Sequence, residues 1–509
     1  MKNTGNFIRM LFSIPLVCVV LIAGCGGNAP EEPEATPIVL PTAIPEQQPE
    51  TGGELLLPMP RNPFIGANGA ATNALLVGTE EMRTLYSLVY EPLLRCDANN
   101  RVIASLVEKW SCDDTGRVWT FELRENVLWH DGEGVLTASD VKHTINLILA
   151  MGEESFYYPL LYQAYESMET LDNKTFTITF RRSGQMSLYA LMFPVLCVRN
   201  APETLNGTGP YKLQYAGETR VELAVNTQWW RQSPYIPTVR FLARESNDVA
   251  LDSYDAGQLN MVPTSNVAAG KHREEGVTVV LDIGTQDCEA LLFNHNRGTL
   301  RNLLVRQAIA HAIDRSAIVS NIYMNRAAIC DVPVPPDSFL YDSTTKIYDY
   351  DPGKAETLLR EAGYTEKDED GFYVSNGRRL SLTLLVNDST ENTYRKSAAG
   401  MIASQLAYAG IEVSVVAERL SVGEENGAYE QKLAAGEFDL ALVGLNLERS
   451  GNLALLLSAN GIRNYGGYQS ESMNTLMNAA AAAVDEKRMR ETSAALQQAI
   501  VQELPFITL

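Results

Sequence analysis

The sequence predicts an α/β protein built from two lobes. A chain of 509 residues is too long to fold around one hydrophobic core. Its first half carries short runs of alternating apolar and polar residues, whereas its second half alternates such strands with helices. We therefore expect a strand-rich lobe I at 53–290, with an extra subdomain at 90–200, and an α/β lobe II at 291–500.

The N-terminal segment has the pattern of an export signal. Lys2 and Arg9 give a positive start, and residues 10–23 are almost wholly apolar but too short to span a membrane comfortably. The tetrapeptide Ile22-Ala23-Gly24-Cys25 resembles the lipobox of bacterial lipoproteins. That resemblance implies cleavage after residue 24 and lipidation of Cys25; an ordinary secretory signal that happens to contain a cysteine is the alternative.

Residues 25–52 are expected to be a tether. The stretch is rich in Pro and Glu and nearly free of aromatic residues, so it can bury little apolar surface. No later apolar run reaches 18 residues, and we expect the mature protein to be held at the membrane by lipid alone, outside the cytoplasm.

Charge and reactive residues exclude several function classes. The net charge of −21 disfavours nucleic-acid binding and suits a soluble exported protein. The five histidines are scattered, with no pair at i, i+4, so we predict no metal site. The sequence contains no nucleophile elbow and no evident pair of catalytic carboxylates, so we do not expect an enzyme. We expect no cofactor. Of the seven cysteines, Cys18 leaves with the signal and Cys25 is the lipidation site. For the other five we expect one disulfide or none, with buried free thiols as the default. A Cys96–Cys112 bridge across a hairpin is conceivable, and connectivity cannot be read from sequence.

The first half contains two clear strands and one clear helix start. Residues 119–123 and 176–180 alternate apolar and polar side chains, as half-buried strands do. Between them, Thr137 is a predicted N-cap, and Asp140 three residues later can answer it as in a capping box.

The second half reads as helices and strands in alternation. A strand, a helix and a second strand of these lengths form a βαβ unit with parallel strands. The elements expected in order are a helix over 305–313, a helix from Asp351-Pro352 to Gly363, a strand over 380–386, a helix over 390–410, a strand over 411–415 and a strand over 438–443.

Several different short motifs follow one another along residues 53–509. The main ones are Tyr90-Glu91-Pro92-Leu93, Leu106-Val107-Glu108-Lys109-Trp110, Phe121-Glu122-Leu123-Arg124, Trp129-His130-Asp131-Gly132, Leu136-Thr137-Ala138-Ser139-Asp140-Val141, Gly207-Thr208-Gly209-Pro210-Tyr211 and Asp351-Pro352 through Ala362-Gly363-Tyr364. Together they resemble the family 5 extracellular solute-binding proteins, the oligopeptide, dipeptide and nickel receptors of ABC transporters. Each motif is weak alone, but their order is specific.

The resemblance implies a two-lobed clamshell, like a type II periplasmic binding protein, that closes on a ligand. It implies a monomeric receptor without catalytic chemistry that delivers a peptide or other small solute to ABC permease subunits. Two alternatives stay open: a sensory lipoprotein using the same clamshell, and a receptor for a metal complex such as a nickel metallophore. In relatives the chain usually returns to the first lobe after the segment that corresponds to residues 501–509. We therefore expect residues 501–509 to begin this return crossover, in a short variant of the family or a truncated product.

The same resemblance directs attention to residues 443–465 for ligand binding. Peptide receptors of this family often carry Trp-x-Ala-Asp-Tyr here, where the aspartate pairs with the peptide α-ammonium. This chain has Leu445 in place of the tryptophan and Glu448 nearest the aspartate. Glu448 is therefore the candidate anchor, an exposed Glu beside Arg449 being the alternative, and the candidate lining residues are Asn446, Asn464 and Tyr465.

Overall fold

The computed structural model describes residues 49–509 except 66–68, 70, 77, 273–276, 347, 390–392 and 422–426. The predicted signal, the Cys25 lipidation site and most of the tether lie outside the described residues. No helix in the described part of the chain is both long and apolar enough to cross a membrane.

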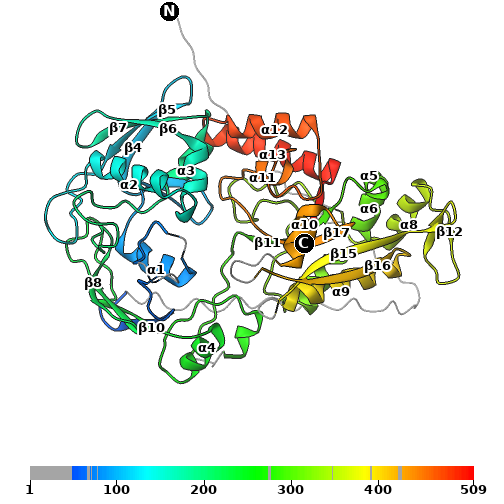
Figure 1. Ribbon diagram of the computed structural model, residues 1–509, viewed down its shortest axis with the longest axis horizontal. Helices are drawn as coiled ribbons and strands as arrows, with labels where there is room; N and C mark the ends of the chain where they lie inside the picture. Colours follow the sequence, from blue (N-terminus) through cyan, green and yellow to red (C-terminus); the bar gives the residue numbers. More distant parts are fainter. Residues whose placement is uncertain are drawn as a thin grey trace, which may run out of the picture. The chain divides into compact units, whose positions relative to one another are not determined.

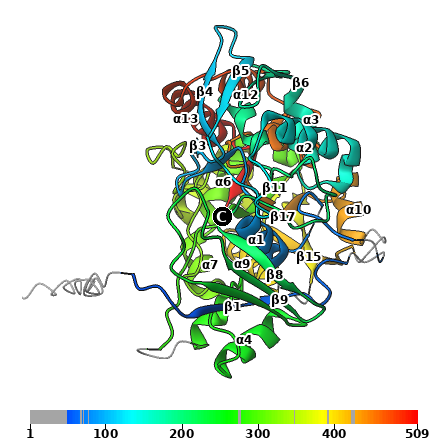
Figure 2. The same ribbon diagram turned by 90° about the vertical axis from the view of Figure 1, so that its left-hand side faces the viewer.

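The first half contains two four-stranded sheets and a short hairpin. One sheet has the order β1 (Glu54–Met59), β10 (Thr238–Ala243), β9 (Arg220–Val225), β8 (Tyr211–Ala216), with β1 parallel to β10. Figure 2 labels β1, β9 and β8 of this sheet. The other is antiparallel, with the order β4 (Val107–Cys112), β5 (Val118–Leu123), β7 (Thr175–Phe180), β6 (Tyr165–Thr170). The hairpin joins β2 (Leu94–Cys96) to β3 (Val102–Ala104).

The helices of this half are short, and one begins where the sequence predicts. They are α1 (Glu80–Val89), α2 (Ala138–Met151), α3 (Tyr158–Ala164), α4 (Asn247–Asp255) and the 3₁₀ turns η1 (Gly152–Glu154), η2 (Gln185–Leu191) and η3 (Val267–His272). Thr137 caps α2, and its backbone N–H donates to the Asp140 carboxylate at 2.8 Å. The predicted strands at 119–123 and 176–180 are confirmed as β5 and β7, which pair with each other.

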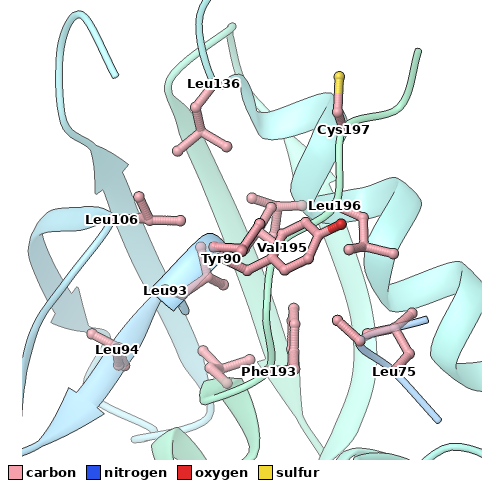
Figure 3. Packing of buried hydrophobic residues seen from close by; sticks show 14 of the residues in the cluster. Leu75, Tyr90, Leu93, Leu94, Leu106, Leu136, Phe193, Val195, Leu196 and Cys197 are labelled. Atoms are coloured by element: carbon pink, nitrogen blue, oxygen red, sulfur yellow. The ribbon is translucent and has the colours of Figure 1, made fainter. Parts of the chain in front are cut away.

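The motifs of the first half meet in one core, drawn in part in Figure 3. Tyr90, Leu93 and Val195 are among its fully or nearly fully buried side chains. Gly207 lies against the end of α1, where a Cβ atom would stand 1.9 Å from the Val89 carbonyl oxygen. The glycine of this turn is therefore required by close backbone contact.

A buried carboxylate joins two of these motifs to a tryptophan. Glu91 is 5% exposed and accepts hydrogen bonds from the Thr208 hydroxyl at 3.1 Å and the Trp230 indole at 2.9 Å. Trp230 also packs against the hydrophobic core of this lobe.

The second half forms one mixed five-stranded sheet between two helical layers (Figure 1). Its order is β16 (Glu412–Arg419), β15 (Ser381–Asp388), β17 (Leu440–Asn446), β11 (Asp287–Phe293), β18 (Phe506–Thr508). β15 is parallel to both β16 and β17, as the predicted βαβ unit requires, whereas β11 is antiparallel to its neighbours.

Alternate residues of each strand face different helical layers. Leu291 and Leu442 pack with α6 (Leu303–Ala312), α8 (Pro352–Glu361) and α9 (Thr393–Tyr408). Leu292 and Val443 pack with α10 (Ala428–Ala435), α11 (Ala454–Leu457), α12 (Glu471–Ala481) and α13 (Glu486–Glu503). The remaining elements are α5 (Gly298–Arg301), α7 (Arg315–Asn321) and a small sheet of β12 (Glu366–Lys367), β13 (Tyr373–Ser375) and β14 (Arg378–Arg379).

Two predicted boundaries fall inside elements of this sheet. The boundary between residues 290 and 291 cuts β11, all of which pairs within the second sheet. The expected crossover at 501–509 contains the end of α13 and β18, and β18 pairs with β11 in the same sheet.

Candidate functional site

Polar side chains gather at one edge of the second sheet. The carboxyl ends of β15 and β17 meet there because the two strands are parallel, and the amino end of antiparallel β11 joins them. Asp287 lies opposite Asn446 in the register, and the Asn446 amide donates to the Asp287 carboxylate at 2.8 Å. Open α/β sheets bind ligands at the carboxyl ends of their parallel strands, so this edge is the candidate site.

Arg395, near the start of α9, ties the three strands together at this edge. Its guanidinium donates to both Glu289 carboxylate oxygens, at 2.7 and 2.9 Å, and to the Asn387 amide oxygen at 2.9 Å. A Cβ atom on Gly444 would lie 2.1 Å from the Arg395 Nη2 atom. Only a glycine in β17 therefore leaves room for the guanidinium.

Two polar groups beside this ion pair have unused hydrogen-bonding capacity. Asn387 is 0% exposed and its Nδ2 has no partner among the described residues; the Tyr323 hydroxyl is also buried without one. Burial raises the pKa of Tyr323, and the nearby charge of Glu289 raises it further. Buried polar groups are nearly always hydrogen-bonded, so these two donors are free to serve a ligand.

Glu448 is half-buried in the loop that follows β17. Its carboxylate accepts a hydrogen bond from the Ser450 hydroxyl at 3.1 Å. Burial raises its pKa, opposed by Ser450 and more weakly by the charge of Arg463. The alternative interpretation was an exposed Glu beside Arg449; Glu448 is half-buried, and the Arg449 guanidinium donates to the Asn100 amide oxygen of the first lobe at 3.4 Å. The role of Glu448 as an anchor stays a prediction.

The other three candidate residues differ in how much they can offer a ligand. Asn446 is exposed at the sheet edge. Asn464 bonds within its own loop, accepting from the Tyr468 backbone N–H and donating to the carbonyls of Ser458 and Tyr468. Tyr465 is half-buried and packs against the second helical layer. Ligand contacts by these residues stay predictions.

Sequence reasoning missed Glu289, Asn387 and Arg395. One signal was available, since Asn387 and Asp388 directly follow the alternating run that becomes β15. The other two carry no local signal, because Glu289 reaches this edge only through the pairing of β11 with β17.

Two hollows are described on the surface, and one of them is lined in part by the candidate residue Asn464. One, lined by His295, Arg463, Asn464 and Tyr468, has room for about one water molecule, 10 Å³. A second, of 270 Å³, is lined in the first lobe by groups that include His130 and Lys212. The Lys212 ammonium already donates to the His130 carbonyl at 3.0 Å.

The chemistry of the edge suits binding through charges and hydrogen bonds. It offers a carboxylate at Glu448, an ion pair at Arg395 and two buried donors. Within the described ranges, no group of three or more His, Cys, Asp or Glu side chains is arranged to hold a metal ion.

Comparison with known proteins gives consistent matches. A model of the family described as bacterial extracellular solute-binding proteins, family 5 middle, matches residues 101–462. The oligopeptide-binding protein AppA of Bacillus subtilis (strain 168) is 23% identical over 99% of this chain and 93% of its own length. The nickel-binding periplasmic protein of Escherichia coli (strain K12) is 25% identical over 68% of each chain.

Solved structures match over most of the chain. HbpA2 from Haemophilus parasuis has a TM-score of 0.76 and 20% identity, covering 90% of this chain and 93% of its own. AppA from Bacillus subtilis in complex with a nonapeptide has a TM-score of 0.64 and 22% identity, covering 91% and 93%. These likenesses show the two-lobed α/β fold that the sequence predicts.

Proposed function

Because the chain belongs to the family 5 bacterial extracellular solute-binding proteins, we propose that it binds a peptide outside the cytoplasm and delivers it to the permease of an ABC transporter. In this proposal the protein is a receptor without catalytic chemistry. The ligand lies between the lobes against the polar edge of the second sheet. Closure of the lobes follows from the ligand's higher affinity for the closed state.

The half-buried carboxylate of Glu448 carries the peptide assignment. Among the described residues, no cation is hydrogen-bonded to it, and burial penalises its charged form. A peptide α-ammonium would supply the missing positive charge, and a charge-assisted hydrogen bond would offset the cost of burial. The unpartnered Asn387 amide and Tyr323 hydroxyl would donate to peptide carbonyl or carboxylate oxygens.

Glu448→Gln tests this role of the carboxylate. We expect the variant to bind peptides with a free N-terminus about 10- to 100-fold more weakly, because an amide cannot provide a charged partner. N-acetylated peptides should lose nothing. Isothermal titration calorimetry on both peptide classes measures the difference, and Glu437→Gln, an exposed Glu before β17, is the control.

Native mass spectrometry of the purified protein tests the ligand class. A ladder of co-purified short peptides supports the proposal. A metal complex, or a protein that stays empty in the presence of peptide libraries, would overturn it in favour of the metal-complex or sensory alternative.

We further propose that Cys25 carries the lipid that anchors the protein to the membrane. Two or more acyl chains hold a protein stably at a bilayer. Cys25→Ser should therefore move the protein from the membrane fraction to the soluble extracytoplasmic fraction, as an immunoblot would show. Cys112→Ser is the matched control, and membrane retention of the Cys25 variant would contradict the proposal.

A further inference from the structure

Two cysteines far apart in sequence lie together beside the candidate site. Cys288 belongs to β11 and Cys330 to the segment that follows α7. They are 8% and 7% exposed, and both thiols belong to one hydrophobic cluster on the α10–α13 face of the second sheet. Both thiols are reduced in the structure.

Backbone hydrogen bonds hold the two cysteines in register. The Leu509 N–H donates to the Glu289 carbonyl at 2.9 Å, and the Cys330 N–H donates to the Leu509 carbonyl at 3.0 Å. β18 ends at Thr508, and the next residue, Leu509, thus joins the backbone of Glu289, the neighbour of Cys288, to the backbone of Cys330. Both side chains lie on the same face of the sheet, and the Cys330 thiol donates to the Val332 carbonyl at 2.8 Å.

The surroundings differentiate the two thiols. The hydrogen bond with the Cys288 thiol lowers the pKa of Cys330, and the charge of Arg315 contributes in the same direction. That hydrogen bond and burial raise the pKa of Cys288. The thiolate is the reactive form in disulfide chemistry, so Cys330 is suited to attack and Cys288 to complete the bond.

We propose that Cys288 and Cys330 form a disulfide in the exported protein. The proposal rests on the extracytoplasmic location of the family, where disulfides form and persist. The Cys330 thiolate attacks one sulfur of an extracytoplasmic disulfide oxidant and forms a mixed disulfide; the Cys288 thiolate then displaces the oxidant's thiol. The two electrons reduce the oxidant's disulfide, and its two sulfurs take up, through solvent, the two protons that the cysteines lose, so the oxidant leaves as a dithiol.

The bridge would fix the base of a strap, residues 330–341, that reaches the first lobe. In this strap the Phe339 N–H donates to the Asn99 carbonyl at 2.9 Å, and the Asn99 amide donates to the Asp337 carbonyl at 2.9 Å. The disulfide would therefore join β11, which carries Glu289, to a segment that contacts the other lobe.

Peptide mapping of the full chain, recovered from the extracytoplasmic membrane fraction, tests the bridge. The protein is alkylated under denaturing conditions with and without reductant. We expect a cross-linked peptide pair containing Cys288 and Cys330 that disappears on reduction. Cys96, Cys112 and Cys197 should be alkylated in both samples.

Two variants and a stability measurement complete the test. Cys112→Ser should keep the cross-link, and Cys330→Ser should lose it. Reduction should lower the Tm of the wild type by about 4 °C, as expected for the loop that Cys288 and Cys330 would close. Reduction should leave the Tm of Cys330→Ser unchanged. Alkylation of Cys288 and Cys330 without reductant, or a link from either to another cysteine, would overturn the proposal. If Cys330→Ser does not fold, the wild-type map still decides. The peptide map needs no ligand. A negative result would therefore contradict the disulfide without bearing on the proposed receptor function.

Discussion

His130 shows how a motif residue acts at the scale of single atoms. Its Nδ1 accepts a hydrogen bond from the Gly207 N–H at 3.3 Å, and its Nε2 lies 2.9 Å from the Gly209 carbonyl oxygen, to which it donates. Only the neutral ring with its proton on Nε2 fits both partners. Burial lowers the pKa of His130 to about 4, Lys212 lowers it further, and Gly209 and Asp131 oppose the shift.

This tautomer predicts acid lability. The folded-state pKa lies below the ordinary value of 6.5, so the stabilising contribution is complete above pH 6.5 and is lost as the pH falls toward 4. We expect the free energy of unfolding, measured in urea, to fall by about 3 kcal/mol over that window on account of this group. His130→Gln should show a shallower pH dependence; the same slope in both proteins would contradict the assignment.

Glu91 and Glu448 show what residue-scale reasoning from sequence could and could not reach. The order of the motifs singled out Glu448 because it stands where relatives carry an aspartate. Its burial could not be predicted, because it depends on how the loop after β17 folds around the carboxylate. Glu91 was visible in a motif, but its bonds to Thr208 and Trp230 span 117 and 139 residues of sequence.

At the scale of elements, local signals proved sufficient for helix starts. Asp351 caps α8, its carboxylate accepting from the Lys354 N–H at 2.9 Å, and Pro352 occupies the first turn. The cap and the proline were both predicted from sequence. The helix ends before Gly363, whose φ of 97° suits glycine.

The cap predicts a graded pair of variants. Asp351→Ala should lower the free energy of unfolding by about 1 kcal/mol, because it leaves backbone N–H groups of the first turn without an acceptor. Asp351→Asn should keep most of the stability, since an Asn side chain caps equally well. Chemical denaturation measures both; equal losses would assign the effect to charge instead.

Strand periodicity predicted β5, β7, β15, β16 and β17, whose apolar residues face a core on alternate positions. It could not predict that β11 is antiparallel within an otherwise parallel group. That pairing depends on contacts between residues about 150 positions apart, which leave no local pattern. The arrangement that brings Glu289 to the candidate site was hidden for the same reason.

At the scale of the whole molecule, one surface feature departs from the acidic character of the chain. Val277, Val279, Leu281 and Ile283 stand at alternate positions of one segment and are 72 to 77% exposed. An exposed row of apolar side chains favours association between molecules.

Charge on this row should reduce aggregation. We expect Val279→Lys combined with Leu281→Lys to raise the onset temperature of aggregation, followed by light scattering during heating. Ile462→Lys is the control, since Ile462 is also 75% exposed but lies in another loop. An equal gain from the control would attribute the effect to net charge rather than to the row.

The pairing of distant strands also sets the order in which the lobes can be completed during export. The first sheet needs only β1 and β8–β10, so all of its strands are present once residue 243 has crossed the membrane. β11 pairs with β17 and β18, and must wait for residues 440–446 and then 506–508. The sheet of the second lobe can therefore be completed only after nearly the whole chain has been translocated. Until then β11 lacks its partner strands and is exposed to aggregation unless a chaperone binds it.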